Sequence, residues 1–332
     1  MQVIFGLNGL KKIYPKVVAT LGVFDGVHRG HQKIVRKVVQ RARTIKGTSM
    51  VLTFEFHPMK ILCPGLCPPY LTTLDQKLAL LKKAGVQKAV VIPFNRRFAS
   101  IPAKKFVSDV LLKKIQVKDF MVGADYRFGN KAEGDILLLS ACAKEYGFKV
   151  TLVAPAYVNK KVVSSTWIRQ LIQQGELRFA AQLLGHAHSL IGKVVRGARR
   201  GRKLKIPTAN FYPRVEDVLP KIGVYAVYVL VEGTRTRGVC NIGLRPTFHK
   251  KKQKQTIPWP LLEAHLLDTK KNLYGKIIDV QFIERLRAEK KFSSPYLLKK
   301  QIIKDIQKAR ECLRTVDYHG GRHPLSFSEG NL

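Results

Sequence analysis

The first half of the chain alternates short apolar runs with amphipathic stretches, and this alternation constrains the fold more than any other feature. Strands are expected in the apolar runs at 17–22, 49–54, 88–92, 119–123 and 148–153. Helical patterns lie between them, near 31–46, 74–84, 103–115 and 135–146. Strands that alternate with helices form a parallel sheet with helices on both faces. We therefore expect an α/β domain.

The pattern changes after about residue 188. Runs rich in Val, Ile and Tyr are separated by Gly, Pro and charged turns, at 189–195, 223–231, 237–242, 261–267 and 276–283. This pattern is typical of an antiparallel unit, and we expect a small β-barrel. An amphipathic helix is predicted at 294–314, and a short helical pair at 166–184 joins the two halves. The expected domains are 1–184 and 185–332.

The segment Gly22–His31 joins the first expected strand to the first expected helix. Its glycines let backbone N–H groups approach an anion, and the helix N-terminus adds partial positive charge there. We expect Gly22, Phe24, Asp25 and Gly26 to bind a nucleotide phosphate.

His28 and His31 are three residues apart and share one side of the first helical turn. A His-x-x-His pair can bind a metal, but no Cys or carboxylate stands at zinc spacing here. We interpret the two imidazoles as donors that stabilise charge on phosphoryl oxygens during in-line attack.

Three consecutive hydroxyl residues, Ser164, Ser165 and Thr166, precede Arg169 by one helical turn. One hydroxyl would serve as an ordinary helix N-cap. Three hydroxyl residues followed by an arginine indicate a site that binds a pyrophosphate leaving group. The guanidinium of Arg169 would supply several charged hydrogen-bond donors.

A third motif, Val122–Gly129, follows an expected strand. Asp125 beside aromatic residues such as Phe128 can hold a planar ring system, although the aromatics can equally belong to the core. His57, after the strand at 49–54, fits a structural role as well as a functional one.

Composition limits the class of protein. The 332 residues include 60 Lys and Arg against 22 Asp and Glu, a formal net charge of +38, spread over both halves. Such a surface favours polyanions, but no basic-aromatic nucleic-acid module appears, so nucleic-acid binding is the less favoured interpretation. No apolar run reaches the ~20 residues of a membrane span. Five scattered cysteines do not suggest a disulfide framework, and we expect a cytoplasmic location.

Together these motifs resemble the bacterial bifunctional riboflavin kinase/FAD synthetase family, over about residues 15–314. His28-Arg29-Gly30-His31 resembles the His-x-Gly-His signature of its FMN adenylyltransferase module, a Rossmann-like nucleotidyltransferase. The second half resembles its riboflavin kinase module through Pro207-Thr208-Ala209-Asn210, Gly223–Ala226, Asn241–Phe248, Glu263–Asp268 and Leu273–Lys276. The chain departs from the family at Lys205, where Gly is usual, and at Thr269, where an aromatic is usual.

The resemblance implies two consecutive ATP-dependent reactions. The second half would phosphorylate riboflavin to FMN with Mg²⁺-ATP. Glu263 would be the base, Thr208 and Asn210 would bind the metal and the phosphates, and Gly201 would lie near the phosphates. The first half would join FMN to a second ATP and release pyrophosphate, using His28, His31 and Arg169 as catalytic residues. Flavin contacts are expected at Asp125, Phe128 and Arg245. ATP, riboflavin and FMN are the implied partners, with no membrane.

Two alternatives stay open at this stage. One is an FMN adenylyltransferase whose barrel binds flavin without kinase activity. The other is a nucleic-acid-binding protein built on this fold, as the net charge suggests.

Overall fold

The computed structural model describes residues 1–196, 206–244, 260–269 and 272–318. These form two compact units, Met1–Ser165 and Thr166–Leu332. The division precedes the expected boundary at 184/185, because Leu177 of the intervening helical pair packs into the core of the second unit. In the part of the chain that is described, no helix combines the length and the apolar character needed to cross a membrane.

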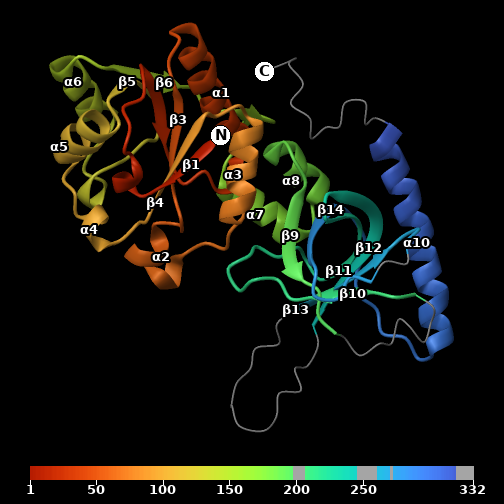
Figure 1. The fold of residues 1–332 in the computed structure, drawn as a ribbon. Coiled ribbons are helices and arrows are strands. Elements are labelled where there is room, and N and C mark those ends of the chain that lie inside the picture. Colours follow the sequence, from red (N-terminus) through yellow and green to blue (C-terminus); the bar gives the residue numbers. More distant parts are fainter. Residues whose placement is uncertain (197–205, 245–259, 270–271, 319–332) are drawn as a thin grey trace. The chain divides into compact units, whose positions relative to one another are not determined.

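The first unit contains a six-stranded parallel sheet, which confirms the predicted α/β fold (Figure 1). The strands, in spatial order, are β1 Gln2–Phe5, β4 Lys88–Ile92, β3 Ser49–Phe54, β2 Val17–Leu21, β5 Val117–Gly123 and β6 Lys149–Val153. Strand β1 was not expected. It is a four-residue edge strand that pairs only with β4 and is largely exposed, so it carries little hydrophobic signal.

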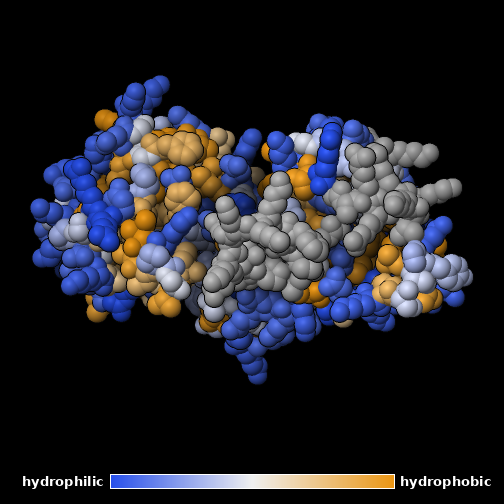
Figure 2. All heavy atoms as spheres, turned by 90° about the horizontal axis from the view of Figure 1, so that it is seen from below, coloured by the Kyte–Doolittle hydropathy of each residue, from blue (hydrophilic) through white to orange (hydrophobic). Residues whose placement is uncertain are grey.

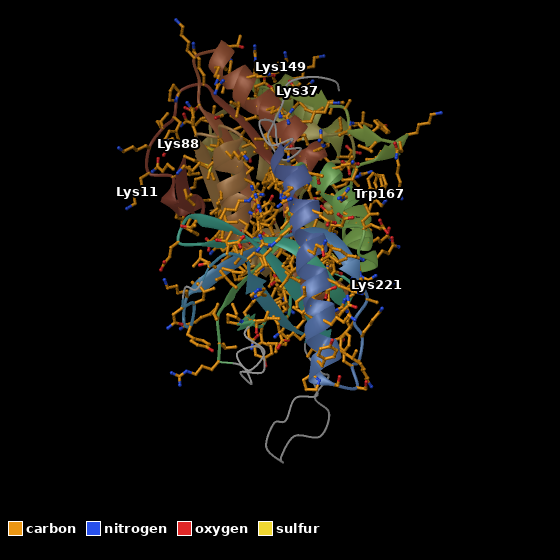
Figure 3. The ribbon with its side chains drawn as sticks, turned by 90° about the vertical axis from the view of Figure 1, so that its right-hand side faces the viewer. Lys11, Lys37, Lys88, Lys149, Trp167 and Lys221 are labelled. Carbon is orange, nitrogen blue, oxygen red and sulfur yellow. The ribbon has the colours of Figure 1, made fainter. Side chains whose placement is uncertain are left out.

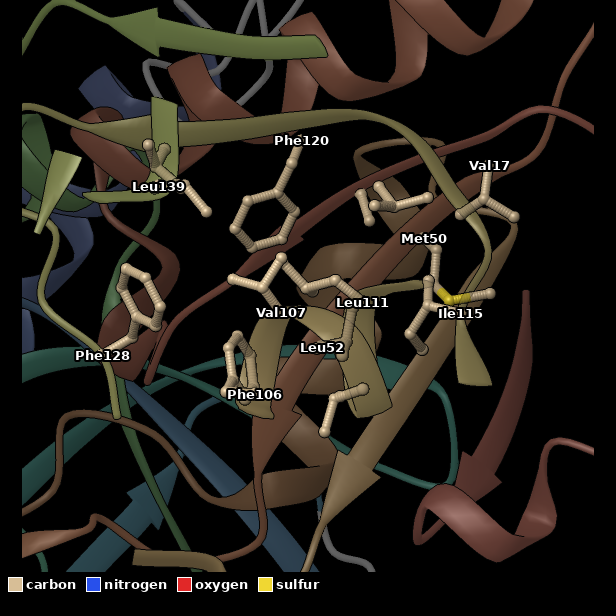
Figure 4. Packing of buried hydrophobic residues seen from close by; sticks show 14 of the residues in the cluster. Val17, Met50, Leu52, Phe106, Val107, Leu111, Ile115, Phe120, Phe128 and Leu139 are labelled. Carbon is tan, nitrogen blue, oxygen red and sulfur yellow. The ribbon is translucent and has the colours of Figure 1, made fainter. Parts of the chain in front are cut away.

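Residues of the central strands alternate between two cores, one on each face of the sheet. In β3, Met50 and Leu52 pack on one face and Val51 on the other. A strand buried on both faces reads as a continuous apolar run, which is why the sequence located β3 so closely. Figure 4 shows the larger core, where Phe120 of β5 faces Val107 and Leu111.

The helices of the first unit cover the sheet. The principal ones are α1 Arg29–Thr44, α3 Leu74–Lys83, α5 Ala103–Lys105, the π-helix η4 Phe106–Lys114 and α6 Ile136–Tyr146. The helix expected at 103–115 is thus mainly a π-helix. The remaining short elements are η1 Leu7–Gly9, η2 Asp25–Val27, α2 Met59–Leu62, η3 Pro64–Leu66, α4 Arg96–Ala99, η5 Asn130–Ala132 and the hairpin of β7 Tyr157–Val158 with β8 Lys161–Val162.

The strand order reverses between β2 and β5. From β2 the chain proceeds to β3 and β4 on one side, whereas β5 and β6 lie on the other. In open α/β sheets, ligands bind at the carboxyl ends of the strands flanking such a reversal. Gly22 follows β2 directly and Gly123 ends β5, so both predicted motifs of this unit border the switch point.

The second unit begins with α7 Ser165–Gln174, whose first residue belongs to the first unit, and α8 Leu177–Leu184. An antiparallel six-stranded sheet follows, as predicted. Its spatial order is β10 Ala209–Phe211, β13 Pro260–Leu266, β12 Thr234–Leu244, β11 Gly223–Val231, β14 Ile277–Arg287 and β9 His188–Lys193.

The two edges of this sheet meet and close it into a barrel. The Val195 N–H, just after β9, donates to the Asn210 carbonyl of β10 at 2.7 Å. Beside it, Gly192 lies against Phe211, and a Cβ on Gly192 would be 2.2 Å from Cδ2 of that ring. Edge closure satisfies backbone groups that an open sheet would leave unpaired.

Strand β11 is buried on both faces. Tyr225 and Val227 point into the barrel, whereas Val224 and Ala226 face a second core. Figure 1 shows the long helix α10 Pro295–Tyr318. Its residues Ala309 and Leu313 belong to that second core. The predicted terminal helix is therefore confirmed.

Candidate functional site

Residues 22–28, named here the phosphate turn, have an unusual backbone. Phe24, Gly26 and Val27 all have positive φ, at 51°, 79° and 39°. Glycine adopts this region freely, but a bulky or β-branched residue is strained there by about 1–3 kcal/mol. Such a turn persists only where neighbouring groups hold it in place.

The carboxylate of Asp25 provides one of these holds. It accepts the backbone N–H of Leu71 at 3.0 Å and that of Thr72 at 3.1 Å, as well as the Thr72 hydroxyl at 3.3 Å. The Gly26 N–H in turn donates to the Thr72 hydroxyl at 3.0 Å. The Asp25 side chain thus ties the turn to the segment before α3.

Two donors fix the carbonyl of Val23. The Thr53 hydroxyl and the Lys77 ammonium each donate to it at 3.1 Å, and Lys77 also donates to the Phe54 carbonyl at 2.8 Å. Burial lowers the pKa of Lys77 to about 8, an effect that the charge of Asp25 partly opposes. Sequence reasoning missed Lys77. In the sequence, Lys77 is marked only by its position four residues before Leu81, on a helix that has several other apolar residues.

His28 caps helix α1. Its ring nitrogen Nδ1 accepts the His31 N–H at 3.4 Å, so Nδ1 carries no proton and Nε2 carries it instead. The His28 and His31 rings stack with centroids 3.6 Å apart and planes at 19°, and the Phe24 ring meets His31 edge-on at 5.2 Å. The two predicted histidines thus act as one paired unit at a helix N-terminus.

Close packing brings the hydroxyl motif to the phosphate turn. A Cβ on Gly30 would lie 3.1 Å from Cε1 of His28 and 3.6 Å from the Val163 carbonyl. Two residues on, the Ser165 hydroxyl donates to the Asp25 carbonyl at 3.1 Å. Ser165 therefore lies beside the phosphate turn, and the predicted role of Ser164 and Ser165 in phosphate binding stays a prediction.

Thr166 and Arg169 continue from Ser165 into α7, within the second unit. Thr166 is exposed, whereas Arg169 is buried one turn further on. Their predicted roles on pyrophosphate stay predictions.

The motif after β5 separates into an exposed and a buried part. Asp125 is exposed, and its Oδ1 would lie 3.1 Å from a Cβ on Gly123, which would also be 3.9 Å from Ile34 of α1. Phe128 packs into the core, stacked on Tyr126 at 5.5 Å and tilted against Phe106 at 5.6 Å. Both flavin contacts remain predictions, and Asp125 is the better exposed of the two.

A second polar group lies on the barrel. Strands β10, β13 and β12 place Asn210 opposite Glu263, and Glu263 opposite Asn241. Their neighbours along the strands point into the barrel, so this row lies on its outer face. The Thr208 hydroxyl donates to Asn210 Oδ1 at 3.3 Å, which adds a fourth polar side chain.

Glu289 extends this group. A Cβ on Gly243 would lie 2.5 Å from Glu289 Oε1 and 3.1 Å from Asn241 Nδ2. The absence of a side chain at position 243 thus leaves room for Glu289 beside the row. Asn241 and Glu289 were not predicted as site residues, because only strand register and the path of the chain after β14 reveal them.

Three residues that the sequence analysis named lie outside the described residues: Gly201, Lys205 and Arg245. Thr269 is described and half-buried. Within the part that can be searched, no group of three or more His, Cys, Asp or Glu side chains could hold a metal ion.

The positive charge is distributed over both units. Lys11, Lys37 and Lys149 of the first unit and Lys221 of the second are exposed, and Figure 3 labels each of them. On the face of the molecule shown in Figure 2, hydrophobic patches lie between the hydrophilic residues.

Two family models match the chain. The model described as FAD synthetase matches residues 10–167, and the model described as riboflavin kinase matches residues 184–313. The first match contains the histidine pair and the hydroxyl motif, and the second contains the Thr208–Glu263 row.

Curated relatives match nearly the whole chain. The bifunctional riboflavin kinase/FMN adenylyltransferase of Escherichia coli (strain K12) is 40% identical, with 94% of this chain and 97% of that protein covered. Proteins of the same description from Haemophilus influenzae and Bacillus subtilis are 36% and 34% identical, covering 93% and 90% of this chain and 98% and 93% of their own length.

Among solved structures, a macrolide-efflux protein from Streptococcus pneumoniae matches with a TM-score of 0.82 at 29% identity. The match covers 93% of this chain and 99% of that one.

Proposed function

The chain belongs to the family of bifunctional riboflavin kinases/FMN adenylyltransferases, and we propose that its two reactions are divided between the two units. The enzyme phosphorylates riboflavin to FMN with ATP and adenylates FMN to FAD with a second ATP. We assign FMN formation to the barrel and FAD formation to the unit with the parallel sheet. The observation that carries this assignment is that the histidine pair lies in the first unit and the Glu263 row in the second.

At the barrel, Glu263 is the candidate base. It would accept the proton of the primary ribityl hydroxyl as the hydroxyl oxygen attacks the γ-phosphorus of ATP and the bond to ADP breaks. Asn210 and Asn241 flank Glu263 on the neighbouring strands, where they can orient the carboxylate and the hydroxyl.

Thr208 and Asn210 fit a magnesium ion that arrives with ATP. Their side-chain oxygens are 3.3 Å apart, close enough to approach one cation together. Magnesium is usually held by one or two protein oxygens plus substrate phosphates, so a larger protein cage is not needed. When bound, the ion would neutralise charge that builds on the phosphates.

At the phosphate turn, the attacking group is the FMN phosphate, which is already a nucleophile. Its oxygen forms a bond to the α-phosphorus of ATP as the bond to pyrophosphate breaks. No base is required, so the chain contributes positioning and charge stabilisation. His28 would donate a hydrogen bond from Nε2–H to the reacting phosphate, and His31, the amides of the turn, Ser164 and Ser165 would contribute beside it. Thr166 and Arg169 would bind the pyrophosphate.

Product analysis tests this division. Riboflavin with Mg²⁺-ATP should yield FMN and then FAD, resolved by chromatography. His28→Ala with His31→Ala should abolish FAD formation, a loss of at least ~100-fold expected for removed transition-state donors, and leave FMN formation unchanged. An equal fall in FMN formation would contradict the division.

The state of the cysteines supports a reducing compartment. All five are free, and Cys142 and Cys240 are buried. We infer a cytoplasmic enzyme on this basis.

A further inference from the structure

We propose that Lys77 is a positioning residue for FAD formation, because its ammonium fixes the backbone of the phosphate turn. The inference rests on the proposed function of the first unit. Lys77 itself makes and breaks no bond in the reaction. Its effect is on the direction of the amides that would receive the nucleotide phosphates.

Packing alone does not explain a lysine at this position. The side chain is 6% exposed on α3, where Leu81 is the other buried residue. Lysine is rarely buried to this extent, since desolvation disfavours its charged form. An apolar side chain of similar length would fill the same volume without that cost.

The contacts of Lys77 reach both strands that end at the site. Its Nζ donates to the Val23 carbonyl just beyond β2 and to the Phe54 carbonyl at the end of β3. The Val23–Phe24 peptide is trans, like the other described peptide bonds. A carbonyl and the following N–H point in opposite directions across a trans peptide. Holding the Val23 carbonyl toward Lys77 therefore turns the Phe24 N–H to the opposite side.

The strain of the turn makes this hold necessary. Phe24 and Val27 both adopt positive φ without being glycine. Strained backbone of this kind survives when several contacts determine it, as it often does in ligand-binding turns. Here Asp25 anchors the middle of the turn to Leu71 and Thr72, and Lys77 with Thr53 anchors its beginning. Among the described residues, the Thr53 hydroxyl would be the remaining donor to the Val23 carbonyl without Lys77.

The charge of Lys77 acts in the same direction. A positive charge behind the turn is weakly screened because it is buried. It therefore adds to the attraction that the helix N-terminus exerts on phosphate.

The decisive experiment measures both reactions on the full-length chain. Lys77→Met keeps the length of the side chain and removes its N–H donors and charge. We expect FAD formation from FMN and Mg²⁺-ATP to fall about 100-fold, as for a misplaced reacting group, with both a higher KM for ATP and a lower kcat. FMN formation from riboflavin should stay at the wild-type rate.

Two control variants separate positioning from stability. Lys82→Met removes an exposed lysine of the same helix and should change neither reaction. Thr73→Ala removes the α3 capping box, in which the Gln76 N–H donates to Thr73 at 3.1 Å, and destabilises the same helix by about 1 kcal/mol without touching the phosphate turn. If Lys77→Met and Thr73→Ala lower FAD formation equally, the role of Lys77 is structural and the inference is wrong.

A second substitution tests the carbonyl contact if Lys77→Met does not fold. Thr53→Val is isosteric and removes the other donor to Val23. We expect a two- to tenfold higher KM for ATP, from the net value of one hydrogen bond. Because Lys77 still donates to the Val23 carbonyl in this variant, a fall in FAD formation as large as that expected for Lys77→Met would make Thr53 the main hold and overturn the inference. A wild-type chain that forms no FAD would instead overturn the proposed function.

Discussion

Asn210 on β10 lies directly opposite Glu263 on β13, and this pairing places the candidate base of the barrel next to the candidate magnesium ligands. The two residues are far apart in the sequence. Antiparallel register brings them together on one face of the sheet, with Asn241 on the next strand.

Glu263→Gln should remove the proton acceptor while keeping the shape of the side chain. We expect FMN formation from riboflavin to fall about 100-fold or more, the usual contribution of a general base. FAD formation from supplied FMN should persist, which chromatography of the two product mixtures will show. Loss of both activities would mean that Glu263 has a structural role.

Gly192→Ala should destabilise the second unit. A Cβ at this position would lie 2.2 Å from Cδ2 of Phe211, where barrel closure brings β9 and β10 together. Overpacking of this kind costs about 1–3 kcal/mol. Denaturant unfolding should show the loss, whereas Gly65→Ala, with nothing within 4 Å, should leave stability nearly unchanged. An unaffected midpoint in Gly192→Ala would argue against the closed barrel.

Asp305→Ala should detach α10 from the barrel. Asp305 is 2% exposed and accepts bonds from Arg287 at 2.7–3.0 Å and from Gln301 at 2.9 Å. Its removal leaves the guanidinium of Arg287 poorly compensated, which costs about 3–5 kcal/mol for a buried pair. Calorimetry should show a lower Tm. As a control, Asp109→Ala, which breaks the exposed pair with Lys113, should change Tm little.

His188 should make the second unit sensitive to acid. Burial lowers its pKa from 6.5 to about 4, partly opposed by the bond from Nε2–H to the Val218 carbonyl. Between these pH values the unfolded chain binds a proton that the folded chain does not. Stability attributable to His188 is therefore complete above pH 6.5 and is lost as the pH falls toward 4. In denaturation curves across this range, His188→Gln should flatten the pH dependence; an unchanged slope would exclude His188 as its source.

Much of the fold could be predicted because buried parallel strands are recognisable locally. All five strands expected in the first half are present, as are the strands of the barrel and the terminal helix. The exceptions have physical reasons. Strand β1 is short and exposed at a sheet edge, and β10 has three residues, so neither produces a long apolar run. The helix expected at 103–115 has the predicted apolar residues but winds mainly as a π-helix, a difference that side-chain pattern alone does not reveal.

The candidate site was less predictable. The sequence identified Gly22–His31 and Ser164–Arg169 because glycine turns and hydroxyl caps are local signals. It did not reveal that the carboxylate of Asp25 accepts the backbone N–H groups of Leu71 and Thr72, and the predicted phosphate role of Asp25 stays a prediction. No local signal pointed to Lys77, whose partners are backbone carbonyls of two other strands.

The sequence by itself determined the kinds of elements, their order and the chemistry of the motifs, because periodicity, turn residues and side-chain type are properties of short segments. Only the tertiary structure decided which groups meet. Strand order places Gly22 and Gly123 at one switch point, register aligns Asn210, Glu263 and Asn241, and packing directs Lys77 at the Val23 carbonyl. These relationships depend on contacts between distant segments, which form only when the sheet and the barrel are assembled.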